Sequence, residues 1–499
     1  MTKLSTLCLL LAGSVCFTSC DKDDNDMQNA SGPDIMVYGL TESNELVAFN
    51  AQSPSIFSSR KAITGIGSGE KLMSIDFRPA TGELYVLSNA SKLYVLNTST
   101  AAVRAVGSAF TPALSGTVAS IDFNPTVDRI RLVSNNGQNL RLHPETGATA
   151  GTDQPINGGG TPSIGGIAYT NSKSGASSTT LYDLDASSGK LFKQEPPNNG
   201  VLVEVGSLGF TFSGQAAFDI SPDNSVALVA VKSGSSNPLY TLDLNTGKTT
   251  GIGNLSQSLL DIAIPTDPVA YAVDATNKLH IFNPASPTVV TKSIEGLQPG
   301  ETIHGIDFRP ATGQLFALGS TSRLYVLNLG TADAVQVGAI PFIPALSGND
   351  FGFDFNPTVD RIRVVSNTGQ NLRLNPDNGL VAGTDGALNP GTPAVSAAAY
   401  TNNFAGSTAT RLFVIDHTTD KLYEQNPPNN GVLVEIGALG VDITSANGFD
   451  IGGTSNKAWV LATAGGTTRI YTLNTSTGAL AEPVNFPVAV KGFAVGLGF

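Results

Sequence analysis

The sequence predicts an all-β fold built from short antiparallel strands, and three observations support this prediction. The 499 residues include 54 glycines and only 14% charged residues, a composition typical of a turn-rich globular protein. Apolar and polar residues alternate in short stretches such as E-L-Y-V-L at 83–87, with Gly, Pro, Asn and Asp between them, which is the pattern of strands joined by hairpins. No stretch keeps a period of about 3.6 residues over the length of a helix.

The body of the chain is a tandem duplication. The segment F-N-P-T-V-D-R-I-R at 123–131 returns unchanged at 355–363. Likewise, P-P-N-N-G-V-L-V-E at 196–204 returns unchanged at 427–435. Matches of this length at a fixed offset indicate two copies of one folding unit.

Each copy also contains a shorter repeat that begins with an apolar strand, often carrying an aspartate. The strand starts are Ile75, Ile121, Ile167, Phe218, Ile262, Ile306, Phe353, Ala398, Phe449 and Phe493. They lie 44 to 51 residues apart. Four short antiparallel strands every ~45 residues are typical of a β-propeller blade, so the sequence predicts five blades in each copy.

The first blade of copy one lacks an opening strand, and two arrangements supply it. If 259–264 completes copy one and 491–499 completes copy two, the chain forms two tandem five-bladed rings, at 34–265 and 267–499. The alternative is one ten-bladed ring closed by the C-terminal strand, which the short connection from Pro265 to Pro268 favours. Because propellers usually have about four to eight blades, we expect two rings.

The N-terminus resembles a bacterial lipoprotein signal. Lys3 precedes an apolar stretch at 4–17 that is too short to span a bilayer comfortably. The small residues Thr18 and Ser19 then precede Cys20. An ordinary secretory signal with an incidental cysteine is the alternative.

We therefore expect residues 1–19 to be a lipoprotein signal peptide, Cys20 to be acylated and 20–33 to be a flexible acidic tether. The lipid makes the membrane a partner of the protein. The run D-K-D-D-N-D at 21–26 resembles a surface-export tag. We expect an outer-membrane lipoprotein that faces the cell exterior, with a periplasm-facing lipoprotein as the alternative.

Charge and motifs exclude several classes of function. The formal net charge of -12, without a basic cluster, argues against binding nucleic acid. The sequence contains no H-E-x-x-H, P-loop or G-x-S-x-G motif. Its four histidines do not recur between the copies, since Asn375 replaces His143. We therefore predict no catalytic residue and no cofactor.

Aspartates recur near the opening strands of the blades. They are Asp76, Asp122, Asp219, Asp261, Asp307, Asp354 and Asp450. Carboxylates around a channel are suitable ligands for a hard cation. Aspartates more often accept backbone N–H groups at hairpin turns, so we predict no metal site.

The most distinctive block spans residues 122–142. Arg129 and Arg131 share one strand face there, and between packed blades their guanidinium groups need partners, for which Asp122 and Asp128 are candidates. A structural network is the first interpretation.

The second interpretation places a row of side chains on one rim, where amide and guanidinium donors contact a sugar or a peptide. These candidate binding residues are Asn135, Gln138, Asn139 and Arg141, with Asn367, Gln370, Asn371 and Arg373 in the second copy. The P-P-N-N-G segments at 196–200 and 427–431 predict rigid exposed loops, with recognition by their asparagines as the alternative.

The repeated motifs resemble the bacterial family named domain of unknown function (DUF) 4394. The motifs are I-D-F-R-P-A-T-G, F-N-P-T-V-D-R-I-R, G-Q-N-L-R-L and N-P-P-N-N-G, and the resemblance covers about 35–499. It implies an exported or surface protein without an assigned activity. Members with one copy imply that a single copy closes by itself.

These observations predict a lipid-anchored, non-catalytic cell-surface β-propeller that binds a glycan or a protein. The alternative is an extracellular propeller hydrolase or lyase that acts on a carbohydrate through carboxylates at a channel mouth. The chain offers no histidine or carboxylate pair that the sequence places in one site.

The first testable prediction concerns Cys20. Intact-mass analysis of the protein from its native host should show loss of residues 1–19 and added acyl mass on Cys20, because small residues precede it and an acidic stretch follows it. A soluble product with an unmodified Cys20 would contradict this prediction.

Overall fold

The computed structural model describes residues 30–158, 160–445 and 447–499. The predicted signal peptide and Cys20 lie outside the described residues. Within them, no helix is long and apolar enough to cross a membrane. The two single-turn 3-10 helices, η1 (Pro197–Asn199) and η2 (Pro428–Asn430), are the helical segments in this part of the chain, which confirms the all-β prediction.

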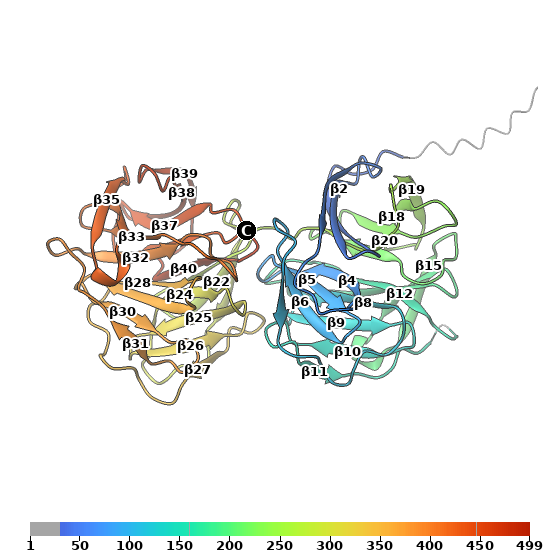
Figure 1. Ribbon diagram of the computed structural model, residues 1–499, viewed down its shortest axis with the longest axis horizontal. Helices are drawn as coiled ribbons and strands as arrows, with labels where there is room; N and C mark the ends of the chain where they lie inside the picture. The colour runs from blue at the N-terminus through green and yellow to red at the C-terminus, as the bar shows by residue number, and fades with distance from the viewer. Residues whose placement is uncertain (1–29, 159, 446) are drawn as a thin grey trace, which may run out of the picture.

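The strands form ten four-stranded antiparallel sheets, arranged as two rings that lie side by side (Figure 1). The strands of ring one are β1 (Met36–Thr41), β2 (Glu45–Asn50), β3 (Phe57–Ala62), β4 (Leu72–Phe77), β5 (Leu84–Ser88), β6 (Lys92–Leu96), β7 (Val103–Val106), β8 (Ala119–Asn124), β9 (Arg129–Ser134), β10 (Asn139–Leu142), β11 (Thr149–Thr152), β12 (Ile164–Tyr169), β13 (Leu181–Asp185), β14 (Lys190–Gln194), β15 (Leu202–Ser207), β16 (Ala217–Ile220), β17 (Ala227–Ala230), β18 (Pro238–Leu242), β19 (Thr249–Asn254) and β20 (Leu259–Ala263).

Ring two repeats the same order. Its strands are β21 (Ala270–Val273), β22 (Lys278–Phe282), β23 (Val290–Ser293), β24 (Ile303–Arg309), β25 (Gln314–Gly319), β26 (Arg323–Leu327), β27 (Ala334–Val337), β28 (Phe351–Asn356), β29 (Arg361–Ser366), β30 (Asn371–Leu374), β31 (Val381–Thr384), β32 (Val395–Tyr400), β33 (Leu412–Asp416), β34 (Lys421–Gln425), β35 (Leu433–Ala438), β36 (Asn447–Ile451), β37 (Ala458–Ala464), β38 (Thr467–Leu473), β39 (Leu480–Asn485) and β40 (Gly492–Val495).

Each ring is closed by its own last strand. β20 pairs antiparallel with β1, with Tyr38 opposite Ala263, and β40 pairs antiparallel with β21, with Ala270 opposite Val495. This pairing confirms two five-bladed rings, and the ten-bladed alternative is wrong. Prolines flank the connection between the rings at Pro265 and Pro268. Because proline donates no ladder hydrogen bond, the connection does not continue as a hairpin.

The core lies between the blades. The innermost strands β4, β8, β12, β16 and β20 follow one another around the channel of ring one. Every residue of β4 and of β12 is buried. The outermost strands β3 and β11 alternate between half-buried and exposed residues. Apolar strands packed on both faces and a polar outer edge follow from this radial arrangement.

Aspartates on the innermost strands connect neighbouring blades. Asp76 accepts the N–H of Phe77 at 2.7 Å and, on the next blade, the N–H of Phe123 at 2.7 Å. Asp219 accepts the N–H of Ile264 at 2.5 Å in the same way. The sequence predicted that these aspartates accept backbone N–H groups at hairpin turns. That location is wrong for these two aspartates, because the second N–H group belongs to the next blade, in β8 for Asp76 and directly after β20 for Asp219.

Asp183 on β13 is a buried carboxyl without a partner. Both carboxylate oxygens lack a hydrogen bond, and the residue is fully buried. It stands opposite Ile167 and Phe192 on the flanking strands. Burial, opposed by the charge of Arg131, raises the pKa of Asp183 to about 8. In ring two the corresponding residue is Val414.

The second prediction is that Asp183→Val stabilises the protein. The pKa of Asp183 is raised on folding, so its contribution to stability is greatest below the usual aspartate pKa of ~3.9 and is lost as the pH rises towards 8. The gain in unfolding free energy should therefore be small near pH 4 and about 1 to 3 kcal/mol near pH 8. Denaturant titrations at both pH values measure it.

The matched control is Val414→Asp, which should destabilise ring two and introduce the same pH dependence. A loss of stability in Asp183→Val at both pH values would contradict the prediction.

Candidate functional site

The two most distinctive motifs of the sequence contact each other. Arg131 on β9 is buried, and its Nη1 donates to Asp153 Oδ2 at 2.6 Å and to Asn139 Oδ1 at 2.7 Å. Its Nη2 donates to Oδ1 of Asn198 in the P-P-N-N-G loop at 2.7 Å. Although burial raises it, hydrogen bonds from Arg141 and Arg131 bring the pKa of Asp153 below its usual value. The loop therefore locks two neighbouring blades together.

Ring two repeats this network residue by residue. Arg363 donates to Asp385 at 2.6 Å, to Asn371 at 2.7 Å and to Asn429 at 2.8 Å. Because both copies form the same hydrogen bonds, the network has the character of a structural element.

The predicted partners of Arg131 were wrong. Asp122 accepts the N–H of Tyr169 on the next blade at 3.0 Å, so its carboxylate is engaged at the channel. Asp128 is held by Arg78 through bonds of 2.9 and 2.5 Å. Arg131 instead reaches the acceptors that follow β11 and β14.

The structure brings the candidate binding residues into internal hydrogen bonds. Gln138 accepts from Ser115 N at 2.8 Å and donates to Ala113 O at 2.9 Å, and Asn135 accepts from Thr117 N at 3.1 Å. These side chains hold the segment between β7 and β8. Gln370 and Asn367 hold the matching segment of ring two.

The remaining candidates stabilise the arginine network. Asn139 donates to Pro197 O at 3.0 Å, and Arg141 makes two bonds of 2.9 Å to Asp153. Asn371 and Arg373 make the corresponding contacts in ring two. Binding of a ligand by these residues stays a prediction, and their internal bonds favour the structural interpretation.

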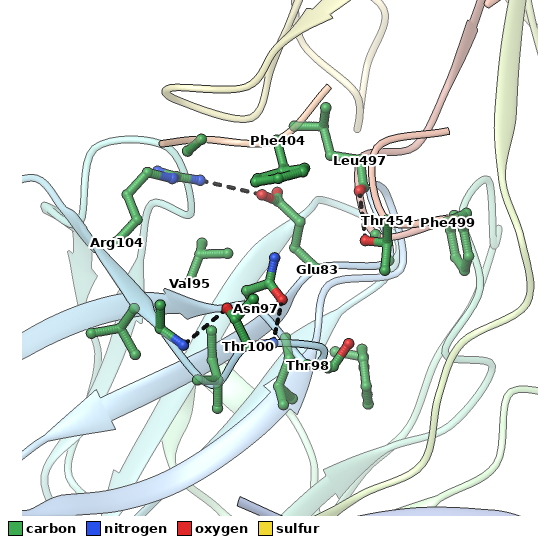
Figure 2. A pocket seen from close by; sticks show the side chains of 18 of the residues that line it. Glu83, Val95, Asn97, Thr98, Thr100, Arg104, Phe404, Thr454, Leu497 and Phe499 are labelled. Atoms are coloured by element: carbon green, nitrogen blue, oxygen red, sulfur yellow. Dashed lines mark hydrogen bonds and ion pairs between the residues drawn. The ribbon is translucent and has the colours of Figure 1, made fainter. Parts of the chain in front are cut away.

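A large cleft that sequence reasoning missed lies between the two rings. Its volume is about 650 Å³. Tyr38, Phe77, Glu83 and Arg104 of ring one and Phe404 and Phe499 of ring two are among its lining residues. In Figure 2, Phe404 lies beside the Glu83–Arg104 ion pair, whose atoms are 3.2 Å apart. The lining thus combines aromatic side chains with polar and charged groups, a mixture that suits a small-molecule site between domains.

The junction between the rings is closed on one side and open on the other. Tyr271 of ring two is fully buried there and donates to Ala80 O at 2.9 Å, with its hydroxyl 2.7 Å from Ser174 Oγ. Its counterpart in ring one is Tyr38, and the counterpart of Ser174 is Ala405. Tyr38 and Ala405 both line the cleft.

The Tyr38 hydroxyl is therefore available to a ligand. Tyr38 is half-buried and packs edge-on against Phe77, with 5.6 Å between the ring centroids. Among the described residues, none forms a hydrogen bond with its hydroxyl. The methyl group of Ala405 replaces the serine hydroxyl that caps Tyr271.

The charged pair in the cleft is also specific to ring one. The residues that correspond to Glu83 and Arg104 are Gln314 and Val335, and they line a smaller cleft of about 310 Å³ on the other ring. The smaller cleft is completed by residues of ring one, including His143. The corresponding blade edge of each ring therefore faces the other ring, and the polar groups on the two edges differ.

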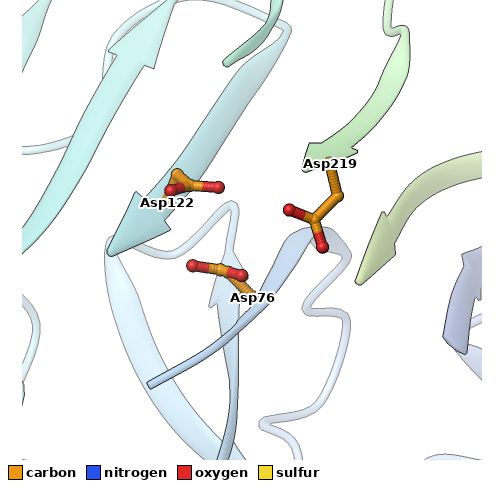
Figure 3. A group of neighbouring side chains, drawn as sticks. All are labelled: Asp76, Asp122 and Asp219. Carbon is orange, nitrogen blue, oxygen red and sulfur yellow. The ribbon is translucent and has the colours of Figure 1, made fainter. Parts of the chain in front are cut away.

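The channel aspartates form one close group in each ring. The groups are Asp76, Asp122 and Asp219 (Figure 3), and Asp307, Asp354 and Asp450, with one oxygen of each residue within 4.8 Å of the others. Burial, followed by repulsion from Asp219, raises the pKa of Asp76 well above its usual value. A carboxyl that retains its proton and accepts backbone N–H groups is a poor cation ligand. The absence of a metal site stays a prediction.

The two closed rings, joined across a lined cleft, define the protein as a tandem five-bladed β-propeller. The family model described as "Domain of unknown function (DUF4394)" matches residues 45–263 and 278–494. The chain belongs to this family, and its two copies are confirmed.

Solved structures resemble the chain only distantly. Two structures of the extracellular domain of BT4673 from B. thetaiotaomicron are 11% identical to it, with TM-scores of 0.26 and 0.27. The similarity covers 91% of this chain and 65%, less than two thirds, of each BT4673 chain. The Dos1 propeller is 13% identical, with a TM-score of 0.26, over 64% of this chain and 82% of its own. No curated protein matches the chain.

The third prediction separates the two arginines that bind Asp153. Arg131→Met should lower the free energy of unfolding by about 2 to 4 kcal/mol, because the buried Asp153 carboxylate loses one of its two arginine partners and Asn198 Oδ1 loses its donor. Arg141→Met should cost about 1 kcal/mol or less, since the Arg141 side chain is 36% exposed. Denaturant titrations measure both values, and equal losses would contradict the structural role of Arg131.

Proposed function

We propose that this protein is a lipid-anchored, extracytoplasmic binding module for a glycan, and that the cleft between its rings holds the ligand. The observation that carries the proposal is the Tyr38 hydroxyl, which stands without a partner in the cleft while its counterpart Tyr271 is capped by Ala80 and Ser174. Since one copy of the chain caps this hydroxyl and the other leaves it open, closure of the rings does not explain the open side.

The groups in the cleft suit a saccharide. Tyr38, Phe404 and Phe499 offer aromatic surface, which packs against apolar faces of a ligand. Asn97 uses its Oδ1 to accept two backbone N–H groups at 2.9 Å, and its amide nitrogen remains as a donor. Sugar hydroxyls both donate and accept hydrogen bonds, so they match this mixture. A concave cleft of about 650 Å³ also suits a short glycan better than a folded protein.

The lining favours binding over hydrolysis. Glu83 is the one carboxylate among the described lining residues, and it is already bonded to Arg104 and to Thr81. Glycosidases of the common types need two carboxyl groups about 5 to 9.5 Å apart. A single engaged carboxylate supports a non-catalytic role.

The anchor completes the proposal. Acylation of Cys20 would hold the chain at the outer membrane, with the cell exterior as the proposed side. About fifteen residues separate Cys20 from Met36, where β1 begins. Such a segment reaches at most about 55 Å when fully extended, so the start of β1 would stay within that distance of the membrane surface.

The fourth prediction tests the cleft. On an array of immobilised glycans, the purified chain should bind a defined set of structures, and Tyr38→Phe should weaken that binding about tenfold, because it removes one hydrogen bond. Glu83→Gln with Arg104→Val, which copies ring two, should change the preferred glycan.

The matched control is Tyr271→Phe, which removes the same atom from the closed side. It should lower the melting temperature and leave glycan binding intact. Unchanged binding by both cleft variants, or no binding to any glycan, would contradict the proposal.

A further inference from the structure

The mouth of the channel differs between the rings at one position in every blade. This position lies three residues before the channel aspartate or its counterpart. In ring one it is occupied by Met73, Ala119, Gly165, Ala216 and Leu260. In ring two it is occupied by His304, Phe351, Ser396, Asn447 and Lys491. Ring two therefore has four polar residues where ring one has none.

Folding does not require these polar residues. Ring one closes with apolar residues at all five positions, and Gln215 spans its mouth by donating to Met73 O at 2.8 Å and to Ala119 O at 3.1 Å. Ring one thus serves as an internal comparison, because it closes without polar residues at these five positions.

One acceptor at the mouth of ring two is buried without a donor. Asn447 is 1% exposed and donates to Ser396 Oγ at 2.8 Å and to Thr444 O at 2.9 Å. Its Oδ1 has no partner among the described residues. A buried amide oxygen without a hydrogen bond costs about 1 to 3 kcal/mol, so it requires an explanation.

A lysine lines the same cavity as Asn447. Lys491 lines the same small cavity, and its Nζ is 3.5 Å from Asp350, a long contact that leaves it free to donate elsewhere. The ring of His304 packs against Phe351, with centroids 4.9 Å apart. Burial and the charge of Lys491 lower the pKa of His304, so the imidazole is neutral near about pH 7.

The space at the mouth sets the size of the group that enters. The cavity between Asn447, Ser396 and Lys491 has a volume of about 10 Å³, which admits one water-sized group. Gly448 and Gly492 bring the innermost strands close together there, since a Cβ on Gly448 would lie 2.5 Å from Phe493 Cβ. The wall cannot widen without moving a strand.

We infer that the mouth of the ring-two channel is a second binding site, which takes one hydroxyl group of a neutral sugar or polyol. A hydroxyl donates to Asn447 Oδ1 and accepts from Lys491 with a single oxygen atom. An ammonium group would be repelled by Lys491, and a carboxylate has no proton to give to Asn447. This site is separate from the cleft between the rings.

The fifth prediction tests this site by NMR of the purified full chain. The four histidines give few imidazole signals, and His304→Met assigns one of them. Titration with methyl glucoside, N-acetylglucosamine and glycerol, each alone at millimolar concentration, should shift the His304 signal in a saturable way with at least one probe. The double variant Asn447→Ala and Lys491→Leu carries the ring-one residues and should bind that probe about tenfold more weakly or not at all.

Two outcomes would overturn the inference. If no probe produces a saturable shift, the cavity holds water only. If the double variant, shown to be folded by its melting curve, responds as the wild type does, the probe binds elsewhere. Tyr38→Phe should leave the His304 response unchanged, so failure here and failure of the cleft are distinguishable.

Discussion

The pairing of β20 with β1 and of β40 with β21 is the constraint on which the rest of the structure depends. Each pair joins the last strand of a copy to its first blade and leaves no open seam in the ring. Because both rings close independently, the connection between them is short, and they meet side by side (Figure 1). Corresponding blade edges of the two rings then meet at the junction. Arg78 of ring one reaches Gly313 O at 3.2 Å, and Tyr271 of ring two reaches Ala80 O at 2.9 Å.

Comparing corresponding residues of the two copies helps to distinguish structural from functional residues within one chain. The Arg131 network and its copy around Arg363 share every partner type, which is the behaviour of a part that holds blades together. Tyr38 and Tyr271 behave differently: the residue is the same, but one hydroxyl is capped and the other is open. The channel mouths also differ, with no polar residue at the five compared positions in ring one and four polar residues in ring two. The networks that the two copies share lie where neighbouring blades touch.

Much of the fold was predictable from the sequence, and the site was not. Repeats of fixed length identify the blades, and L-L-D-I-A-I at 259–264 identifies the closing strand, because both are local patterns. The partners of Arg131 were not predictable, since Asp153 and Asn198 lie 22 and 67 residues away in loops of different blades. The cleft depends on how the rings dock, which no spacing encodes. The ring-two mouth did leave a signal, because aligning the copies at the position before each channel aspartate places Asn447 against Ala216 and Lys491 against Leu260.

Two of the buried channel carboxyls, those of Asp219 and Asp450, join neighbouring blades. Burial raises the pKa of Asp219 and of Asp450 to about 7, each with both oxygens bonded to backbone N–H groups. A general acid or base needs a free carboxyl oxygen that reaches a substrate. Neither Asp219 nor Asp450 has such an oxygen. In ring one a second layer adds to the closure, because Asp261 accepts the Ser74 hydroxyl at 2.5 Å. Ring two replaces that layer with glycines such as Gly305 and Gly492, which leaves a small cavity below the polar mouth. Gln215 therefore spans the mouth of the ring-one channel, whereas the channel of ring two has room for one group from outside. Polar side chains at the mouth can therefore orient a bound group in ring two, where the small cavity lies.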